Sequence, residues 1–404
     1  MGTCLEECFN YFCENENKIE FIIGNEIYID SQTRNEFSKR ETGSKILTNN
    51  LNEEMKRLKE PVLVGLNNIQ LLSYINAILR CLSNTKKLTK YFLENYQYDE
   101  NKKLSNEYYK VISNLWNQEN NNISFTPNSF KEVLFSENKN AQNNCKDLIN
   151  FLFERLHQEL NNININANNN FQIAPDRVNE LSMLNHFLKD FRENYNSPIS
   201  NLFYGILRTK IHCFGCNAIS YDFRYFSFLE FPLEKVIKYN KNMRKMLPIS
   251  ENEENPKIDL YEFFKYLQID NQMTDDNKKL CLVCNKLSDE TFTINLYSCP
   301  RYLIINLNRG KENKYQCTVN FPEQLDLYNY IIYKEGITMY ELYGVICQLP
   351  NSIDGHFVAF CKNINNHEWY LYDDSNVILC TRPKQYLDGI PFMLFYKAAN
   401  EETK

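Results

Sequence analysis

The sequence lacks the features of membrane-spanning, secreted and nucleic-acid-binding proteins. It has no run of about 18 consecutive apolar residues, so no segment is expected to span a bilayer. The first residues, MGTCLEECFNYFCE, lack the basic and then apolar regions of a secretory signal. A net charge of -6 and a pI near 5.6 give no general attraction to nucleic acid or acidic membranes. We therefore expect neither membrane association nor direct nucleic-acid binding.

The composition that is present indicates an ordered protein with reduced cysteines. A hydrophobic content of 43% with 27 Tyr and 27 Phe is typical of a globular chain. Without a secretory signal, the 14 cysteines indicate free thiols and metal ligands rather than a disulfide framework. The expected location is cytoplasmic or nuclear. Asparagine-rich stretches at 120–122 and 161–170 have the composition of low-complexity insertions between structured elements.

By pattern the chain divides into an N-terminal extension and one larger domain. Residues 1–60 are polar, with a predicted strand pair (IEFII and EIYID) and a charged helix at Leu51–Lys59. In the predicted domain at 61–400, helices dominate from about 65 to 196 and strands from about 200 to 398. Helices first and strands later predict an α+β fold. The helices expected are Lys87–Asn95, Asn106–Trp116, Ser129–Phe135 and Lys146–Leu160.

Two C-x-x-C pairs form the strongest metal signal, Cys213 with Cys216 and Cys281 with Cys284. This spacing allows two thiolates to hold one tetrahedral zinc ion. Because a long segment separates the pairs, they must lie on β-hairpin tips that meet in space, and we predict one structural zinc. The alternatives are four free structural thiols, or a redox C-x-x-C without the usual βαβ context. The polar stretch from Lys235 to Pro256 is expected to be an exposed loop.

The segment from Gly65 to Asn84, GLNNIQLLSYINAILRCLSN, combines a turn with a helical pattern of apolar residues. By itself it is an amphipathic helix in which Ser73 serves as the N-cap. It also resembles the cysteine box of the ubiquitin-specific proteases, G-L-x-N-x-G-N-T-C-Y-x-N-x-x-L-Q-x-L. The residues that match are Gly65, Leu66, Asn68, Tyr74, Asn76, Leu79 and Leu82.

The resemblance implies that Ser73 replaces the nucleophilic cysteine of the family and that Leu71 replaces the asparagine that donates to the oxyanion. A cysteine at a helix N-terminus readily forms a thiolate, because the helix dipole lowers its pKa from about 8.5. A serine hydroxyl is far less acidic and needs a base in the transition state. Loss of one oxyanion donor costs roughly 100- to 1000-fold in turnover. The two replacements therefore predict an inactive or nearly inactive site.

Two further segments resemble the histidine box of the same family. GHFVAF, from Gly355, is similar to G-H-Y-x-A-Y, and WYLYDDSNV, from Trp369, is similar to W-Y-x-F-D-D-x-x-V. The resemblance implies that His356 is the general base and that Asp373 orients its imidazole, with Asp374 beside it. A lone histidine on a strand is usually structural. The Asp-Asp pair 17 residues later, together with the C-x-x-C pairs, favours the catalytic arrangement.

The resemblance implies a papain-like fold with a helical thumb, a β palm and zinc-bound β fingers, and ubiquitin or a ubiquitin-like protein as the partner. The function it favours is a pseudo-deubiquitinase that acts by binding ubiquitin or a protein partner. The retained His356 and Asp373 favour an active deubiquitinase instead. A third alternative is a spliceosomal tri-snRNP assembly factor with spliceosomal protein partners, because GLNNI resembles the inactive members of the family found there. Cys4, Cys8 and Cys13 would then be the remnant of a zinc-finger ubiquitin-binding region.

Overall fold

The computed structural model divides the chain into two units, Met1–Glu60 and Pro61–Lys404. The structure describes residues 63–68, 72–116, 124–137, 144–163, 176–245, 257–274, 278–310, 317–349, 355–380 and 389–399, all in the second unit. The predictions made for residues 1–60, including the three cysteines of a zinc-finger remnant, lie outside these residues. Leu71 also lies outside them.

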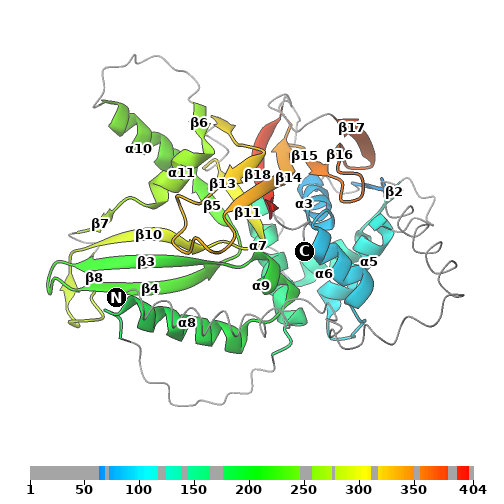
Figure 1. The fold of residues 1–404 in the computed structure, drawn as a ribbon. Helices are drawn as coiled ribbons and strands as arrows, with labels where there is room; N and C mark the ends of the chain where they lie inside the picture. Colours follow the sequence, from blue (N-terminus) through cyan, green and yellow to red (C-terminus); the bar gives the residue numbers. More distant parts are fainter. Residues whose placement is uncertain are drawn as a thin grey trace, which may run out of the picture. The chain divides into compact units, whose positions relative to one another are not determined.

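The second unit consists of helices followed by strands, which confirms the predicted α+β class (Figure 1). Its central helix is α3 (Ser73–Ser83), in which every residue is buried. Among the residues that the structure describes, no helix is both long and apolar enough to cross a membrane. The other helices before the strands are α4 (Lys86–Lys90) with the π-helical turn η2 (Tyr91–Asn95), α5 (Lys103–Trp116), α6 (Asn128–Glu137), α7 (Cys145–Leu160), α8 (Glu180–Asn194) and α9 (Pro198–Phe203).

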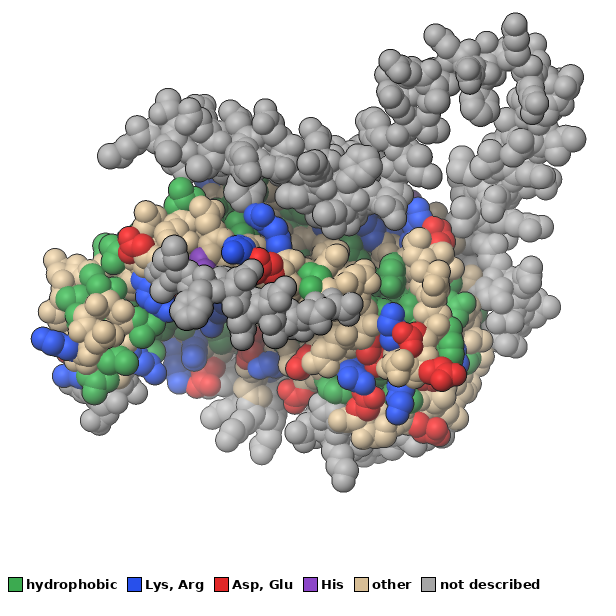
Figure 2. All heavy atoms as spheres, turned by 90° about the horizontal axis from the view of Figure 1, so that it is seen from below, with side chains coloured by type: hydrophobic (Ala, Val, Ile, Leu, Met, Phe, Trp, Pro, Cys, Tyr) green, Lys and Arg blue, Asp and Glu red, His purple; other side chains and the backbone are tan. Residues whose placement is uncertain are grey.

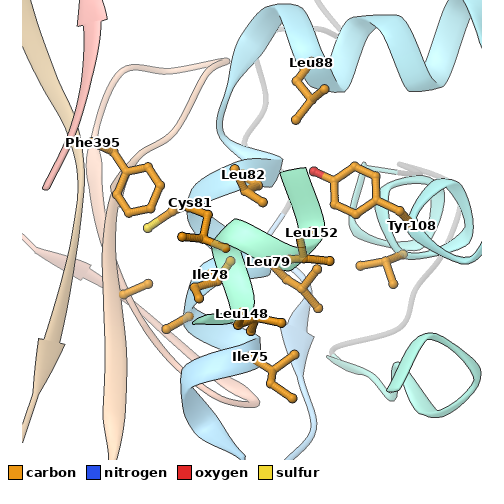
Figure 3. Close-up of a cluster of buried hydrophobic side chains, with 14 of the residues drawn as sticks. Ile75, Ile78, Leu79, Cys81, Leu82, Leu88, Tyr108, Leu148, Leu152 and Phe395 are labelled. Carbon is orange, nitrogen blue, oxygen red and sulfur yellow. The ribbon is translucent and has the colours of Figure 1, made fainter. Parts of the chain in front are cut away.

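Helix α3 is buried because other elements cover it, for the most part with apolar side chains. Figure 3 shows Ile78 and Leu79 next to Leu148 of α7, and Cys81 on the side of Phe395 of β18 (Ile390–Ala398). Full burial of one such aliphatic side chain contributes about 1.5–3 kcal/mol to stability. The N-terminus of α3 is therefore fixed by the same core that joins the helices to the sheet.

The largest sheet has eight strands in the order β17-β16-β15-β14-β18-β11-β5, with β13 paired to β14. Side chains alternate between its faces: along β11, Tyr302 and Ile304 pack on the α3 side, and Leu303 and Ile305 pack on the other side. That second side is covered by α10 (Leu233–Lys245) and α11 (Leu260–Leu267). The other strands are β5 (Leu229–Pro232), β11 (Tyr302–Asn308), β13 (Gln324–Asp326), β14 (Met339–Gln348), β15 (Phe357–Lys362), β16 (Trp369–Asp373) and β17 (Asn376–Cys380).

A second, four-stranded antiparallel sheet has the order β4-β3-β10-β7 and extends away from α3 (Figure 1). Helix α8 packs on it through Leu184 and Phe187, which lie against Phe223. Its strands are β3 (Gly205–Cys213), β4 (Ile219–Phe226), β7 (Asn271–Met273) and β10 (Glu290–Ser298). The short pairs are the parallel β1 (Gly65–Leu66) with β2 (Ser124–Phe125), the parallel β6 (Lys257–Asp259) with β12 (Thr318–Asn320), and the hairpin of β8 (Lys279–Leu280) and β9 (Leu287–Ser288).

Three local predictions differ from the structure. The stretch from Lys235 was expected to be a loop, which is wrong as far as Lys245, because α10 buries Leu233 and Val236 at helical spacing within a polar sequence. The predicted helix at Lys87–Asn95 is α4 followed by a π-helical turn. Helix α8 was not anticipated next to the asparagine-rich stretch. It begins with an Asn179 cap, whose side chain accepts a hydrogen bond from the Ser182 N–H.

Gly65 lies where β1 meets the turn after β16, and a Cβ at this position would lie 2.2 Å from the carbonyl oxygen of Ser375. We expect Gly65→Ala to lower the free energy of unfolding by about 1–3 kcal/mol, measured by urea denaturation. Gly336→Ala is the matched control, because its Cβ would meet a ring carbon of the half-exposed Tyr333 at 3.0 Å, and that ring can move. An equal loss in both variants would contradict the close approach at Gly65.

Candidate functional site

Ser73 is the first residue of α3 and faces the strand that follows His356. The N-cap position is occupied by Leu72, which makes no side-chain cap, so the interpretation of Ser73 as an N-cap is wrong. Its side chain is 4% exposed, and its Oγ accepts a hydrogen bond from the Phe357 N–H at 2.9 Å. The start of the helix is thereby tied to the start of β15.

The structure brings His356 and Asp373 into direct contact. Nε2 of His356 lies 2.6 Å from Oδ1 of Asp373 at the end of β16. Because β15 and β16 pair antiparallel, the residue before β15 and the last residue of β16 lie at the same end of the ladder. Gly355, with φ 65°, makes the turn that precedes the histidine, and a Cβ there would lie 2.1 Å from Nε2 of Gln348.

Asp374 occupies a different position from Asp373, although the two are adjacent in sequence. Its Oδ2 is 3.8 Å from Nε2 of His356, beyond hydrogen-bond distance. The carboxylate instead accepts from the side-chain amides of Asn76 at 2.8 Å and Asn68 at 3.0 Å. Its backbone carbonyl accepts from the Leu66 N–H at 2.8 Å. The first aspartate therefore orients the histidine, and the second joins β1 and α3 to the end of β16.

A lysine lies near this carboxylate. Lys131 of α6 is 4% exposed. Burial lowers the pKa of its ammonium, and the charge of Asp374 opposes that shift. Neither Lys131 nor Asn76 was assigned a role from the sequence, because each acts through a contact that spacing along the chain does not reveal.

A side-chain amide is also present in the site, at a position other than the one predicted. Leu71, the predicted oxyanion position, lies outside the described residues. Asn68, five residues before Ser73, accepts from the Leu72 N–H at 2.9 Å through Oδ1 and directs its amide at Asp374. The predicted loss of the oxyanion donor at position 71 therefore stays a prediction, and the amide of Asn68 is bound to Asp374. Asn68 matches the cysteine-box pattern, and that match is the sequence signal for its position.

Together these residues provide the groups of an acyl-transfer site without a thiol. A hydroxyl stands at a helix N-terminus, an imidazole is oriented by a carboxylate, and an amide donor lies close by. What the arrangement lacks at position 73 is a sulfur atom that can rest as a thiolate.

The four cysteines of the C-x-x-C pairs meet at the end of the four-stranded sheet. The sulfur atoms of Cys213, Cys216, Cys281 and Cys284 lie within 4.8 Å of one another, and those of Cys216 and Cys281 are 3.9 Å apart. A hydrogen bond from the Ser288 hydroxyl, with further ones from backbone N–H groups, lowers the pKa of the Cys213 thiol to about 6. The cluster is therefore placed to hold a metal ion, and four thiolates are the ligand set of structural zinc.

The two turns that carry these cysteines have the same backbone geometry. Each pair is followed by an asparagine in the left-handed region, Asn217 with φ 58° and Asn285 with φ 57°. In each, the first cysteine N–H donates to the carbonyl five residues later, from Cys213 to Ala218 at 3.1 Å and from Cys281 to Lys286 at 2.9 Å. Such paired turns present two sulfurs to one point, as metal binding requires.

The helices correspond to the thumb, the eight-stranded sheet to the palm and the four-stranded sheet to the fingers, which we call the finger sheet. Together with a histidine–aspartate pair facing a helix N-terminus, they define a papain-like hydrolase domain. A family model described as ubiquitin carboxyl-terminal hydrolase matches residues 64–396. The chain therefore belongs to the ubiquitin carboxyl-terminal hydrolase family, which confirms the resemblance found in the sequence.

Individual relatives are distant in sequence. Human ubiquitin carboxyl-terminal hydrolase 2 is 25% identical over 364 residues, covering 85% of this chain and 56% of the relative. Human ubiquitin carboxyl-terminal hydrolase 21 is 26% identical over 372 residues, covering 84% and 62%. The chain thus spans little more than half the length of these relatives. A solved structure of the yeast SAGA DUBm with mutant Sgf73 has a TM-score of 0.59 and 20% identity, covering 84% of this chain and 69% of that one, and shows the fold alone.

Metal content tests the cysteine cluster. We expect the purified protein to carry about one zinc per chain, and Cys213→Ser with Cys281→Ser to abolish it and destabilise the finger sheet. Elemental analysis gives the stoichiometry. The control is Cys299→Ser, because Cys299 is buried outside the cluster. A folded wild-type protein without metal, or equal metal in the cluster variant and the control, would refute the zinc site.

Proposed function

We propose that the chain is a ubiquitin-binding member of its family without hydrolase activity, a pseudo-deubiquitinase. The observation that carries the proposal is Ser73 at the start of α3, where the chemistry of the family requires a thiolate. The histidine–aspartate pair beside it is retained, so the change concerns the nucleophile itself.

The surroundings of Ser73 support a structural role for its hydroxyl. The side chain is buried, and its oxygen accepts the Phe357 N–H, so it links α3 to β15. A buried hydrogen bond of this kind contributes about 1 kcal/mol to stability. The site then serves to hold the thumb against the palm, and the domain binds ubiquitin without cleaving its conjugates.

The proposed partner is ubiquitin or a ubiquitin-like protein, because the relatives are named for ubiquitin. A protein scaffold is a second kind of partner, since the solved yeast structure contains Sgf73 in addition to the similar chain. The proposed location, cytoplasmic or nuclear, rests on the reduced cysteines, since no disulfide joins the cysteines in the described part of the chain.

A serine-dependent hydrolase is the second candidate. It is favoured by the 2.6 Å contact that orients His356 and by the amide of Asn68, because a serine nucleophile needs both a base and an oxyanion donor. A role in spliceosomal tri-snRNP assembly is the third candidate and rests on the GLNNI motif. Selective co-purification of small nuclear RNAs with the tagged chain tests it.

For the wild-type protein we expect no cleavage of a fluorogenic ubiquitin substrate and no labelling by a cysteine-directed ubiquitin probe, because Ser73 supplies no thiolate. Ubiquitin itself should bind in a calorimetric titration, and Ser73→Ala should bind it as well as the wild type. Cleavage that Ser73→Ala abolishes would establish the serine hydrolase instead. Absence of both cleavage and binding would exclude ubiquitin as the partner.

Ser73→Cys should restore labelling by the ubiquitin probe, because a thiol at the N-terminus of α3 would face His356. The turnover of the Ser73→Cys variant, compared with that of further substitutions made in it, then identifies the oxyanion donor. If Asn68 supplies it, Asn68→Ala in the Ser73→Cys background lowers turnover by roughly 100- to 1000-fold, and Leu71→Asn has no effect. A gain of similar size from Leu71→Asn would place the donor at position 71, as the sequence alone suggested. Failure of Ser73→Cys to label would refute the assignment of Ser73.

A further inference from the structure

Large apolar side chains gather at the tip of the finger sheet, here called the fingertip (residues 213–219 and 279–288). Six of them are between 37% and 70% exposed. Soluble monomers rarely leave a large contiguous apolar patch in water, and such patches commonly mark interaction sites. The six residues are Phe214, Ile219, Leu280, Leu282, Val283 and Leu287.

The two turns of the fingertip form one surface. The Phe214 N–H donates to the carbonyl of Asp289 at 3.0 Å, and the Gly215 N–H donates to Oγ of Ser288 at 2.8 Å. Within the hairpin, Leu280 pairs directly with Leu287, so both leucines lie on the same face. Figure 2 shows hydrophobic and basic side chains together at this end of the molecule.

Metal binding does not account for these side chains. The cluster needs the cysteines and the turn geometry, and the residues between the cysteines are free to be polar. Leu282 and Val283 nevertheless occupy the two positions between Cys281 and Cys284 and point into solvent. Their exposure is unfavourable for an isolated chain and becomes favourable when a partner covers them.

The charges beside the patch are basic. Lys279 and Lys286 are exposed, and the hairpin from 279 to 288 contains no acidic residue. The neighbouring Lys278 forms an ion pair with Asp289 at 3.9 Å. A complementary surface would therefore carry acidic groups around an apolar centre.

We propose that the fingertip is a docking knob that inserts into a concave apolar pocket with an acidic rim on a protein partner. The narrow shape of the fingertip favours a concave binding pocket over a helix or another convex surface on the partner, because Leu282 and Val283 lie in the turn of a two-stranded hairpin. The cross-strand leucines form its sides, and the lysines meet the rim.

Site-specific photo-crosslinking identifies the partner. p-Benzoylphenylalanine replaces Leu287 in the full chain, or replaces Leu93 of η2 as a control at an exposed position outside the fingertip. A protein crosslinked from position 287 and not from 93 is identified by mass spectrometry, purified, and titrated against the unmodified chain. No such protein, or crosslinking from both positions alike, would overturn the proposal.

The titration then tests the chemistry of the contact. Leu280→Ser with Leu287→Ser should raise the Kd by about tenfold or more, and Leu93→Ser should leave the Kd unchanged. Lys279→Glu with Lys286→Glu should also weaken binding, and added salt should weaken it for the wild type. Equal zinc content in all variants shows that the fingertip is intact. An unchanged Kd for the leucine pair, or binding to phosphatidylserine vesicles in place of a protein, would refute the proposal.

Discussion

The geometry of the site depends on the hydrogen bonds that the carboxylate of Asp374 accepts. One comes from the side-chain amide of Asn68, which precedes Ser73, and another from that of Asn76, which follows it. Both ends of the segment that carries the serine are therefore fixed to a single group. Its side chain is only 15% exposed. A carboxylate so far from water is stable only with strong hydrogen bonds, and charge-assisted bonds of this kind are the stronger ones. Removal of this group would release β1, the start of α3 and the end of β16 together.

This dependence changes the meaning of the retained Asp-Asp pair. Asp374 is needed for the fold whether or not the site turns over substrate, because it joins thumb to palm. Ser73 has a comparable place, since its oxygen holds the backbone of β15. Only the contact between His356 and Asp373 has the form of catalytic machinery without an evident role in packing. The packing roles of Asp374 and Ser73 are therefore compatible with a domain that binds and does not cleave, whereas the contact between His356 and Asp373 is the feature that favours the serine hydrolase.

The sequence was sufficient to predict features that depend on local spacing, and insufficient to predict those that depend on long-range contacts or a weak local pattern. The period of the strands and the two C-x-x-C pairs placed β3, β10 and the cysteine cluster, because alternation and ligand spacing are local properties. The cysteine-box pattern marks the position of Asn68 in the sequence, but its contact with Asp374 depends on how distant segments meet, which no local pattern encodes. Helix α10 was hidden because its buried face is narrow and the rest of the segment is polar. The left-handed Asn217 and Asn285 belong to the turns that carry the cysteines and become interpretable only once those turns meet.

The core beneath α3 also determines how the thiols of this protein respond to chemical modification. The sulfur atoms of Cys81 and Cys361 lie 3.6 Å apart in the interior, and burial raises the pKa of Cys81 well above the value of an ordinary thiol. Burial likewise raises the pKa of Cys145 and Cys347 to about 12. Cys216 at the fingertip, in contrast, is exposed. Cys216 is the one exposed cysteine among those that the structure describes, so we expect alkylation of the native protein to modify it first and to slow when a metal ion occupies the cluster.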